Sequence, residues 1–378
     1  MNIEKAYKKI KVLFCIEQAS ISYKYYENIF IELNKLAAID IEVFNLIRDE
    51  EVNQHLAQFC SKVYTLPNDK PYKSQVFNIK KIIRQSHPQI IHAHEVIPGF
   101  YAAMGLFVCL SNTKLIFHRH HSFYRNKATR FMERIAFFRC NLAVSVSKTM
   151  QNRTFSEHPF GKKKIAHLYN GINIMDNGLP LPIEIKRYDN YHKIVFLARL
   201  RSRKGHDTAI GAIDIVRNKI PNIILFIAGD GNLRKDIERM IAKNNLQENI
   251  ILLGDVQNIK ALLDEVVISI LPSESEAFNL SILETLACNR LSIASDLPSI
   301  MECIEDRKTG VLIKPGNAKQ LAEKIIYYLE NKIERNEIAA NGYQLYNNKF
   351  TAKLMAEKMT SIYTRLIAGP KRPISFYD

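Results

Sequence analysis

Short apolar strands alternate with longer helical patterns along most of this 378-residue chain. A run such as Lys11–Ile16 has the length and character of a buried strand, and a stretch such as Tyr25–Ala37 has the helical period of about 3.6 residues. Parallel strands need helical crossovers between them, so the alternation predicts an α/β fold with parallel sheets. The predicted strands are 11–16, 41–44, 90–92, 115–118, 142–146, 193–197, 223–228, 250–253, 266–271 and 292–294.

The segment Asp176–Pro182 is rich in turn-forming residues and divides this alternation into two halves. We therefore expect two Rossmann-like domains, one of residues 1–175 and one of residues 190–350. Ligands of open parallel sheets lie outside the carboxyl ends of the strands, so two facing domains imply a cleft between them. The last helical pattern, Thr351–Ile367, predicts a terminal helix.

The composition is typical of a globular protein of the cytoplasm. Hydrophobic residues make up 47% of the chain, the mean hydropathy is −0.14, and no apolar run reaches the ~20 residues that span a bilayer. The charged N-terminus leads straight into a predicted strand, unlike a secretory signal. The six cysteines are scattered without a CxxC pair, which favours small core residues in a reducing compartment.

Positive charge is concentrated in the first half. Residues 1–173 carry 25 Lys and Arg against 13 Asp and Glu, whereas residues 174–378 carry 28 against 25. Much of the excess lies in Arg119, Arg125, Lys127–Arg139 and Lys162–Lys164. A basic amphipathic helix at 127–139 can associate peripherally with an anionic membrane, or it can pack on the sheet and leave its cations in solvent. No nucleic-acid module accompanies the patch, so nucleic acid is not an expected partner.

Two carboxylates, Glu276 and Glu284, stand eight residues apart after the apolar run Val266–Leu271. The first falls in a loop and the second about two turns into the helix expected to follow. Such a junction presents free backbone N–H groups and the positive end of a helix dipole, which suit a phosphate. Carboxylates on either side can bind hydroxyls, as a sugar nucleotide requires. The alternative is an amphipathic helix with two solvated glutamates.

The segment from Glu276 to Glu284 resembles the E-x7-E motif of retaining glycosyltransferases of family 4, which have the GT-B fold. Residues 284–288 and 293–298 are similar to that family's continuation. The resemblance implies that Glu284 binds the ribose of a nucleotide-sugar donor and that Glu276 binds hydroxyls of the donor sugar. It also implies a terminal helix that crosses back onto the first domain. The residues between the two glutamates that are implied to bind the donor are Phe278, Asn279 and Leu280.

Basic side chains follow the first predicted strand of the second half. Arg199 and Lys204 lie in the segment Ala198–Gly205, directly after the strand at 193–197. Fixed cations stabilise the negative charge that a pyrophosphate leaving group gains, without a metal ion. The family has an Arg and a Lys-Gly pair at this spacing, which implies that Arg199 and Lys204 bind the diphosphate. The alternative is a solvated basic loop.

Two further segments follow strands of the second half. Gly229 lies in Ala228–Asn232, which lacks the third glycine of a dinucleotide fingerprint. The family has a similar Gly-x-Gly here, implying that the backbone approaches the nucleotide. The segment Leu253–Val256 is similar to the family segment that reads the base, so the resemblance places Val256 near the base.

Histidines gather at the ends of two strands of the first half, at positions 92, 94, 118, 120 and 121. They lack the His-x3-His helix spacing and the cysteine partners of common zinc sites, so no metal and no other cofactor is expected. In the family a histidine after the second of these strands contacts the donor sugar, which implies His120, with His121 as the alternative register. His94 and Glu95 are then expected to face the acceptor.

Some positions depart from the family pattern. The loop after the first strand, Glu17–Ser22, lacks the usual glycines. Ala277 stands where the family commonly has Gly, and Asn289 and Leu291 replace a usual Gly and Pro. None of these departures removes a charged group.

Together these features predict a metal-independent, retaining glycosyltransferase in the cytoplasm, with a UDP-sugar donor favoured by family frequency. The expected acceptor is a glycan or a lipid-linked sugar, as in surface polysaccharide or lipopolysaccharide synthesis. One rival is a sugar-nucleotide epimerase of the same fold, which would alter the sugar without releasing nucleotide. The other is an inactive GT-B-like binding protein, which would bind nucleotide tightly without turnover.

Overall fold

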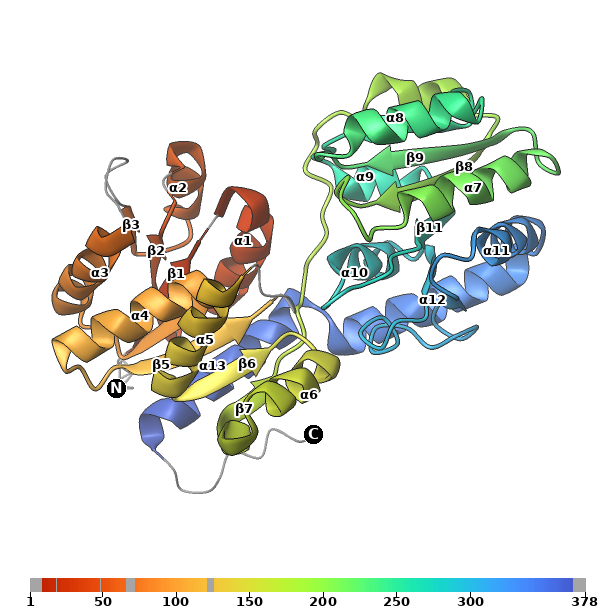
Figure 1. Ribbon diagram of the computed structural model, residues 1–378. Helices are drawn as coiled ribbons and strands as arrows, with labels where there is room; N and C mark the ends of the chain where they lie inside the picture. The colour runs from red at the N-terminus through yellow and green to blue at the C-terminus, as the bar shows by residue number, and fades with distance from the viewer. Residues whose placement is uncertain (1–8, 18, 48, 66–71, 121–125, 370–378) are drawn as a thin grey trace, which may run out of the picture. The chain divides into compact units, whose positions relative to one another are not determined.

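The computed structural model of the protein describes residues 9–17, 19–47, 49–65, 72–120 and 126–369. Contacts divide the chain into two compact units. Unit 1 holds the residues up to Gly171 and those from Ala352 onward, and unit 2 is Ile172–Thr351. Each unit is a parallel sheet covered by helices, which confirms the predicted pair of Rossmann-like folds (Figure 1).

Unit 1 contains a seven-stranded sheet in the order β3-β2-β1-β4-β5-β6-β7. Every pairing in it is parallel, as the helical crossovers require. The strands are β1 (Ile10–Ile16), β2 (Ile39–Asn45), β3 (Lys62–Thr65), β4 (Ile90–His94), β5 (Lys114–Arg119), β6 (Leu142–Ser145) and β7 (Ile165–His167).

Helices cover both faces of this sheet. They are α1 (Ala19–Lys35), α2 (Glu50–Leu56), α3 (Tyr72–Ser86), α4 (Val96–Cys109), α5 (Lys127–Arg139), α6 (Lys148–Glu157), the 3-10 helix η1 (Pro159–Lys164) and α13 (Ala352–Ala368). One face carries α3, α4 and α5, whose apolar residues form one core with alternate residues of the strands, such as Ile91, Ala93 and Phe117. The intervening strand residues face the helices α1 and α13.

The helix α13 belongs to unit 1 although it follows unit 2 in the sequence. It packs against α1, and its Met355, Met359 and Tyr363 are buried. Tyr363 also reaches the sheet, because its hydroxyl lies 2.6 Å from Nδ1 of His92. The predicted terminal helix and its crossing back to the first unit are therefore confirmed.

Unit 2 contains a six-stranded parallel sheet in the order β10-β9-β8-β11-β12-β13. Its elements are η2 (Ile183–Tyr188), β8 (His192–Leu197), α7 (His206–Arg217), β9 (Ile223–Ala228), α8 (Arg234–Lys243), β10 (Ile250–Gly254), α9 (Ile259–Asp264), β11 (Ile268–Leu271), α10 (Leu280–Ala287), β12 (Leu291–Ser295), β13 (Val311–Ile313), α11 (Ala318–Glu330) and α12 (Lys332–Lys349).

The strand order reverses once in each sheet. In unit 1 the chain builds β1, β2 and β3 outward and then returns to place β4 beside β1. In unit 2 it builds β8, β9 and β10 outward and returns to place β11 beside β8. The loops that leave the two central strands at such a point diverge, which opens a crevice at the carboxyl edge where ligands bind. The topology therefore directs attention to the loops after β1, β4, β8 and β11.

Several short elements were not predicted. They are α2, β3, α6, β7 and β13, and none exceeds ten residues. All six cysteines are free thiols. Among the described residues no helix is long and apolar enough to cross a membrane.

Arg119, which contributes to the excess positive charge of the first half, is not a surface residue. Its side chain is buried, and its guanidinium lies 3.0 Å from Glu133 and 2.8 Å from Glu157, while Nη1 donates to Thr154 at 2.7 Å. A buried charge has to be paired, and α5 and α6 supply the two carboxylates. This ion network joins the end of β5 to both helices.

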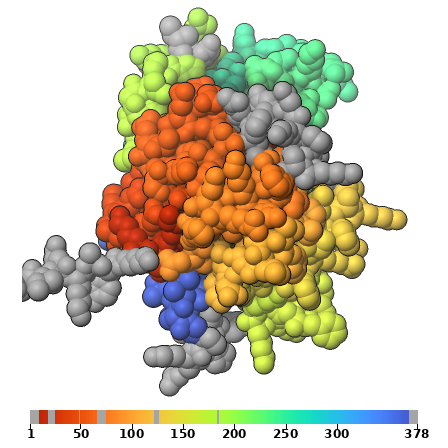
Figure 2. Space-filling view, turned by 90° about the vertical axis from the view of Figure 1, so that its left-hand side faces the viewer, coloured from red at the N-terminus to blue at the C-terminus, as the bar shows by residue number. Residues whose placement is uncertain are grey.

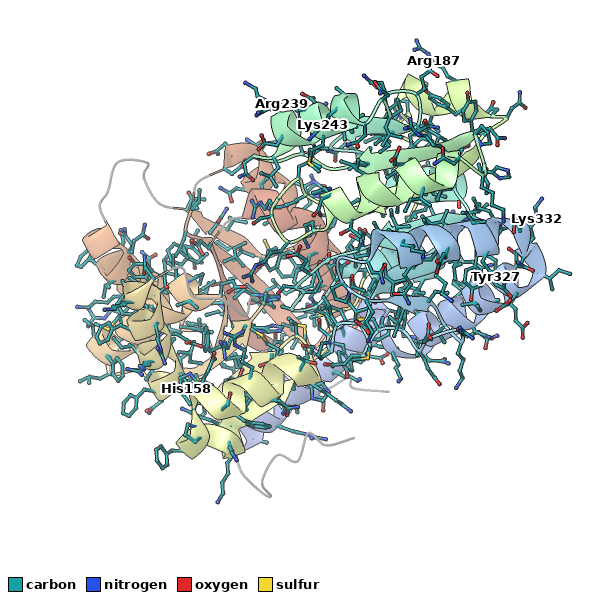
Figure 3. The ribbon with its side chains drawn as sticks, turned by 45° about the vertical axis from the view of Figure 1, so that its right-hand side comes forward. His158, Arg187, Arg239, Lys243, Tyr327 and Lys332 are labelled. Carbon is teal, nitrogen blue, oxygen red and sulfur yellow. The ribbon has the colours of Figure 1, made fainter. Side chains whose placement is uncertain are left out.

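Replacing Arg119 with Leu removes the nearest cation from the buried Glu133 and leaves it only His158, whose Nε2 lies 3.7 Å from Oε1. We expect the free energy of unfolding to fall by about 3–5 kcal/mol, as when one partner of a buried ion pair is removed. Urea unfolding followed by circular dichroism measures the change. The control is Arg239→Ala on α8, whose side chain is 77% exposed and is labelled in Figure 3. That control is expected to cost less than about 1 kcal/mol, and an equally small loss for Arg119→Leu would contradict the assignment.

Candidate functional site

Two loops meet at the carboxyl edge of the unit 2 sheet. The β8 loop (residues 198–205) and the β11 loop (residues 272–279) leave neighbouring strands at the point where the strand order reverses. Gly205 has a φ of 78°, and a Cβ there would lie 2.0 Å from the carbonyl oxygen of Pro272. The backbone N–H of Glu274 donates to the carbonyl of Arg203 at 2.9 Å. The glycine therefore permits the two loops to pack backbone against backbone.

An ion pair joins the same two loops. Nζ of Lys204 lies 2.7 Å from Oε1 of Glu276, whose side chain is only 8% exposed. Ser299 holds the backbone of Glu276 in place, because its hydroxyl donates to the Glu276 carbonyl at 2.8 Å. The structure thus brings together two predicted site residues that are 72 positions apart in sequence. An ammonium has three N–H donors, so Lys204 can keep Glu276 and still bind an anion.

Arg199 precedes Lys204 on the β8 loop and is half-buried. Partial burial, and the nearby Arg201, lower the pKa of its guanidinium, while Asp255 opposes the shift. Its backbone carbonyl accepts a hydrogen bond from Nε2 of His206 at 3.2 Å, which ties the loop to the first turn of α7. Sequence reasoning missed His206, the first residue of that helix, as a positioning residue.

Gly229 and Gly231 lie next to the β8 loop. A Cβ on Gly229 would come within 2.2 Å of the Ala198 carbonyl oxygen, and one on Gly231 within 2.4 Å of the Leu200 carbonyl oxygen. The N–H of Leu200 donates to the Asp230 carbonyl at 3.1 Å. The absence of side chains at Gly229 and Gly231 thus allows close contact with the backbone of the β8 loop. An approach of Gly229 to a nucleotide remains a prediction.

The helix α10 begins beside these loops. Asn279 is its N-cap, and its side-chain oxygen accepts from the N–H of Ile282 at 3.2 Å. Ser281 fixes the first turn to β8 by donating to the carbonyl of Leu197 at 2.8 Å. Glu284 is the fifth helical residue and therefore lies just over one turn into the helix, rather than the two turns expected.

The remaining predicted donor residues of unit 2 lie around this edge and are half-buried. Phe278 packs near Phe350, with ring centroids 6.1 Å apart. Leu280 is the first residue of α10, and Val256 packs on the apolar core beneath β9 and β10. Their placement at the carboxyl edge is compatible with a nucleotide site, and their individual roles remain predictions.

The carboxyl edge of the unit 1 sheet carries four stacked imidazoles. Side chains two residues apart share a face of a strand, and the parallel register sets His94 opposite His118. His92, His94, His118 and His120 therefore lie on one face. Nε2 of His92 is 3.2 Å from Nδ1 of His118, and Nδ1 of His94 is 2.9 Å from Nε2 of His120. We call these four residues the imidazole cluster.

His94 is buried beneath aromatic rings of β1 and α1, at 1% exposure. Its Nδ1 supports His120, whose Nε2 lies 2.9 Å away, and its predicted place on the acceptor side remains a prediction. His120 is half-buried, and its backbone N–H donates to Oε1 of Glu95 at 3.2 Å. The alternative register, His121, lies outside the described residues.

Glu95 links β4 to α4 with an unusual backbone. Its φ of 80° and ψ of 172° fall in a region that is almost restricted to glycine and costs about 1–3 kcal/mol. Its N–H donates to the His118 carbonyl at 2.8 Å, which holds the strained turn against β5. Such strain at a reversal of strand order is typical of a functional position. The predicted acceptor-side role of Glu95 remains open to test.

The imidazole cluster also contains the one group of potential metal ligands found among the described residues. One nitrogen from each of His92, His94 and His118 lies within 4.8 Å of the others. Tetrahedral zinc with Zn–N bonds of about 2.05 Å holds its ligand atoms about 3.4 Å apart. Both nitrogens of His92 already have hydrogen-bond partners, in Tyr363 and His118. The arrangement fits hydrogen-bonded neutral imidazoles better than a metal centre.

Comparison with protein families identifies the chain. The model described as Glycosyltransferase Family 4 matches residues 37–175, and the one described as Glycosyl transferases group 1 matches residues 182–345. The chain belongs to glycosyltransferase family 4. The predicted family, and with it the assignment as a glycosyltransferase that uses a nucleotide-sugar donor, are confirmed.

Relatives of this glycosyltransferase are distant in sequence and close in fold. An uncharacterized glycosyltransferase of Methanocaldococcus jannaschii is 25% identical, over 88% of this chain and 95% of its own. A capsular polysaccharide biosynthesis glycosyltransferase of Staphylococcus aureus is 22% identical, over 62% of this chain and 64% of its own. The structure of Anabaena HepE with UDP and glucose superposes with a TM-score of 0.79 at 20% identity, covering 94% of this chain and 99% of that one. The GT-B fold is confirmed.

Sequence reasoning missed parts of the unit 1 site. Tyr363 of α13 places its hydroxyl 2.6 Å from Nδ1 of His92, and Tyr25 of α1 packs its ring on His120 with centroids 5.7 Å apart. The spacing of His92 from His94, and of His118 from His120, was the available signal, because residues two apart on parallel strands share a face. Tyr25 on α1 and Tyr363 on α13 have no comparable signal in the sequence, because their contacts depend on how the helices pack on the sheet.

The imidazole cluster makes the stability of the enzyme depend on pH. Burial, reinforced by the neighbouring imidazoles, lowers the pKa of His92, His94 and His118 well below 6.5. In the unfolded chain each ring titrates near about 6.5, so below that pH the unfolded state binds more protons. We therefore expect the free energy of unfolding to fall as pH drops from 7 to 5, by up to about 1.4 kcal/mol per pH unit for each ring. Urea unfolding at several pH values measures the slope.

The matched test is His118→Asn, which removes one of the three rings and is expected to reduce this slope by about a third. His87→Asn is the control, because His87 is exposed and its φ of 49° suits Asn. If both variants keep the slope of the natural protein, the cluster is not its cause.

Glu95→Gly tests the strained turn. Glycine adopts the observed backbone angles without strain, so the free energy of unfolding is expected to rise by about 1–2 kcal/mol. Loss of the carboxylate that accepts from His120 is expected to lower turnover at least tenfold. Unfolding and turnover are measured on the same preparation, with Glu95→Gln as the control that keeps the strain. A less stable Glu95→Gly variant would contradict the assignment.

Proposed function

We propose that this enzyme transfers a sugar, with retention of configuration, from a UDP-sugar to a hydroxyl of a glycan or lipid-linked acceptor. The observation that carries the proposal is the ion pair between Lys204 and Glu276 at the point where the unit 2 sheet reverses its strand order. A donor bound there meets a cation for its diphosphate and a carboxylate for its sugar hydroxyls.

Each part of the donor has a proposed partner at this edge. Lys204 and the half-buried Arg199 bind the diphosphate, where fixed cations stabilise the charge of the leaving group. Glu276 accepts from hydroxyls of the donor sugar, and Glu284 from the ribose. The base lies near Val256. Support for uridine is that the Anabaena structure of the same fold contains UDP.

The reaction needs a fixed geometry more than a protein nucleophile. No such nucleophile was predicted at the Glu276 edge, which suits a front-face displacement in which the leaving phosphate helps to deprotonate the acceptor. His120 is proposed to line the sugar pocket, held by Glu95 and by the ring of His94.

The proposed setting is surface polysaccharide synthesis at the inner face of the cytoplasmic membrane. Structures of the same fold include a lipopolysaccharide outer core galactosyltransferase, with a TM-score of 0.71 at 16% identity. A lipid-linked acceptor requires that the enzyme work next to a bilayer, and the excess positive charge of residues 1–173 favours an anionic one.

Calorimetric titration with UDP, GDP and ADP tests the donor site. We expect one nucleotide, UDP, to bind, and Lys204→Ala to weaken it about 10–100-fold, since a hydrogen bond to a charged group contributes about 1.5–3 kcal/mol. Glu284→Ala is expected to weaken it similarly through the ribose. The control is Lys243→Ala, which removes an exposed cation from the end of α8 (Figure 3). Binding that survives both site substitutions would place the nucleotide elsewhere.

A further inference from the structure

Unit 1 exposes an unusual set of large apolar side chains on three neighbouring elements. They come from the end of α4, from α5 and from η1, and we call them the apolar anchors: Phe107, Val108, Leu110, Phe131, Phe138 and Phe160. Three are almost bare, with exposures of 91% for Leu110, 79% for Phe138 and 104% for Phe160. Scattered exposed apolar residues are ordinary, but a group on adjoining elements marks an interaction surface.

The three elements form one continuous surface. Arg139, at the end of α5, donates to the Ser111 carbonyl at 3.0 Å and lies 5.9 Å from the ring centroid of Phe107. Lys164, at the end of η1, donates to the carbonyls of Phe138 and Cys140 at 3.3 and 3.2 Å. In Figure 2 the orange-to-yellow surface of α4 and α5 accordingly runs into the yellow-green surface of the following segment.

The solvent side of α5 is not a normal polar helix face. Residues three and four apart share a face, so Lys127, Phe131, Arg134 and Phe138 form one exposed stripe. Glu133, Ala136 and Phe137 point inward and are buried. The helix therefore packs on the sheet with one face and still presents phenylalanine between cations on the other.

The surface carries positive charge without exposed negative charge. Its exposed cations are Lys127, Arg130, Arg134, Lys162 and Lys163. The segments 99–120, 126–141 and 158–164 contain a single acidic residue, Glu133, and that carboxylate is buried against Arg119. Apolar side chains surrounded by cations are complementary to a bilayer with anionic headgroups, where rings enter the acyl boundary and cations meet phosphates.

The anchors are held in place at some cost to the fold. Leu110 ends α4 with a φ of 53°, a position that usually takes glycine or asparagine, and yet it is a leucine in full contact with solvent. The backbone next to Phe160 packs closely on Phe137, because a Cβ on Gly161 would lie 2.4 Å from the Phe137 ring. That ring stacks on His158 at 3.8 Å between centroids, and His158 is labelled in Figure 3. The fold thus presents apolar groups where it gains nothing from them internally.

We infer that the apolar anchors and their cations dock unit 1 onto an anionic lipid bilayer. The occupant is a membrane surface because the cations lie between the anchors and the surface is free of exposed carboxylates. The inference extends the membrane setting of the proposed function to a defined surface. It rests on contacts within unit 1 alone, and docking needs neither donor nor acceptor.

Co-sedimentation with vesicles tests the inference. The protein is mixed with vesicles of phosphatidylcholine alone or with vesicles that also contain about 30% phosphatidylglycerol, whose negative surface potential attracts basic segments. We expect binding to the anionic vesicles only, weakened by salt. The variant Leu110→Ser/Phe138→Ser/Phe160→Ser is expected to lower the partition coefficient at least tenfold. Because all three side chains are exposed, its unfolding transition is expected to match that of the natural protein.

The matched control is Ile333→Ser on α12, which removes an apolar side chain of 88% exposure from unit 2. It is expected to bind vesicles normally. Equal vesicle binding by the triple variant and the natural protein overturns the inference. The inference is also overturned if the natural protein is a dimer that does not bind vesicles and the triple substitution converts it to a monomer, because the anchors would then form a dimer interface. UDP titration on the same preparations separates the two proposals. The triple variant is expected to bind UDP with the affinity of the natural protein. If the natural protein does not bind UDP, the proposed donor site is wrong, whereas the vesicle result still stands.

Discussion

The return of β11 to the side of β8 is the constraint on which the donor site depends. It brings two loops together that are far apart in sequence, and Gly205 allows their backbones to touch at Pro272. The ion pair between Lys204 and Glu276 is the chemical result. Lys204 and Glu276 come from different loops, so their ion pair depends on the contact between the β8 and β11 loops. The cation and the carboxylate are thereby positioned before any donor arrives, and such preorganisation is a large part of electrostatic catalysis.

Unit 1 uses the same topology for a different chemistry. Its reversal between β1 and β4 carries a strained turn at Glu95, and parallel register stacks the imidazoles of the neighbouring strands. The terminal helix α13 completes the arrangement through Tyr363, so the last helix of the chain supports a site built by strands near its beginning. Burial keeps these imidazoles neutral, and a neutral stack is a rigid support for the half-buried His120.

Much of this was predictable from sequence, and the limits have physical causes. The strand and helix periods predicted both sheets, and the family motif identified the glutamates and the basic loop. Short polar elements such as β3 were not predicted, because four residues are too few to show a clear hydrophobic period. The burial of Arg119 was not predictable, because its partners, Glu133 and Glu157, lie on helices whose packing the sequence does not reveal. The burial of His94 was not predictable, because it depends on rings from α1 and β1.

Binding of the donor pyrophosphate across the β8 and β11 loops is the central element of the proposed function. A crystal structure of the enzyme with a bound UDP-sugar measures this directly. The account predicts that Nζ of Lys204 lies within hydrogen-bond distance of the diphosphate while Glu276 contacts the sugar. A nucleotide bound at the opposite edge of the unit 2 sheet, with Lys204 still directed only at Glu276, would contradict it.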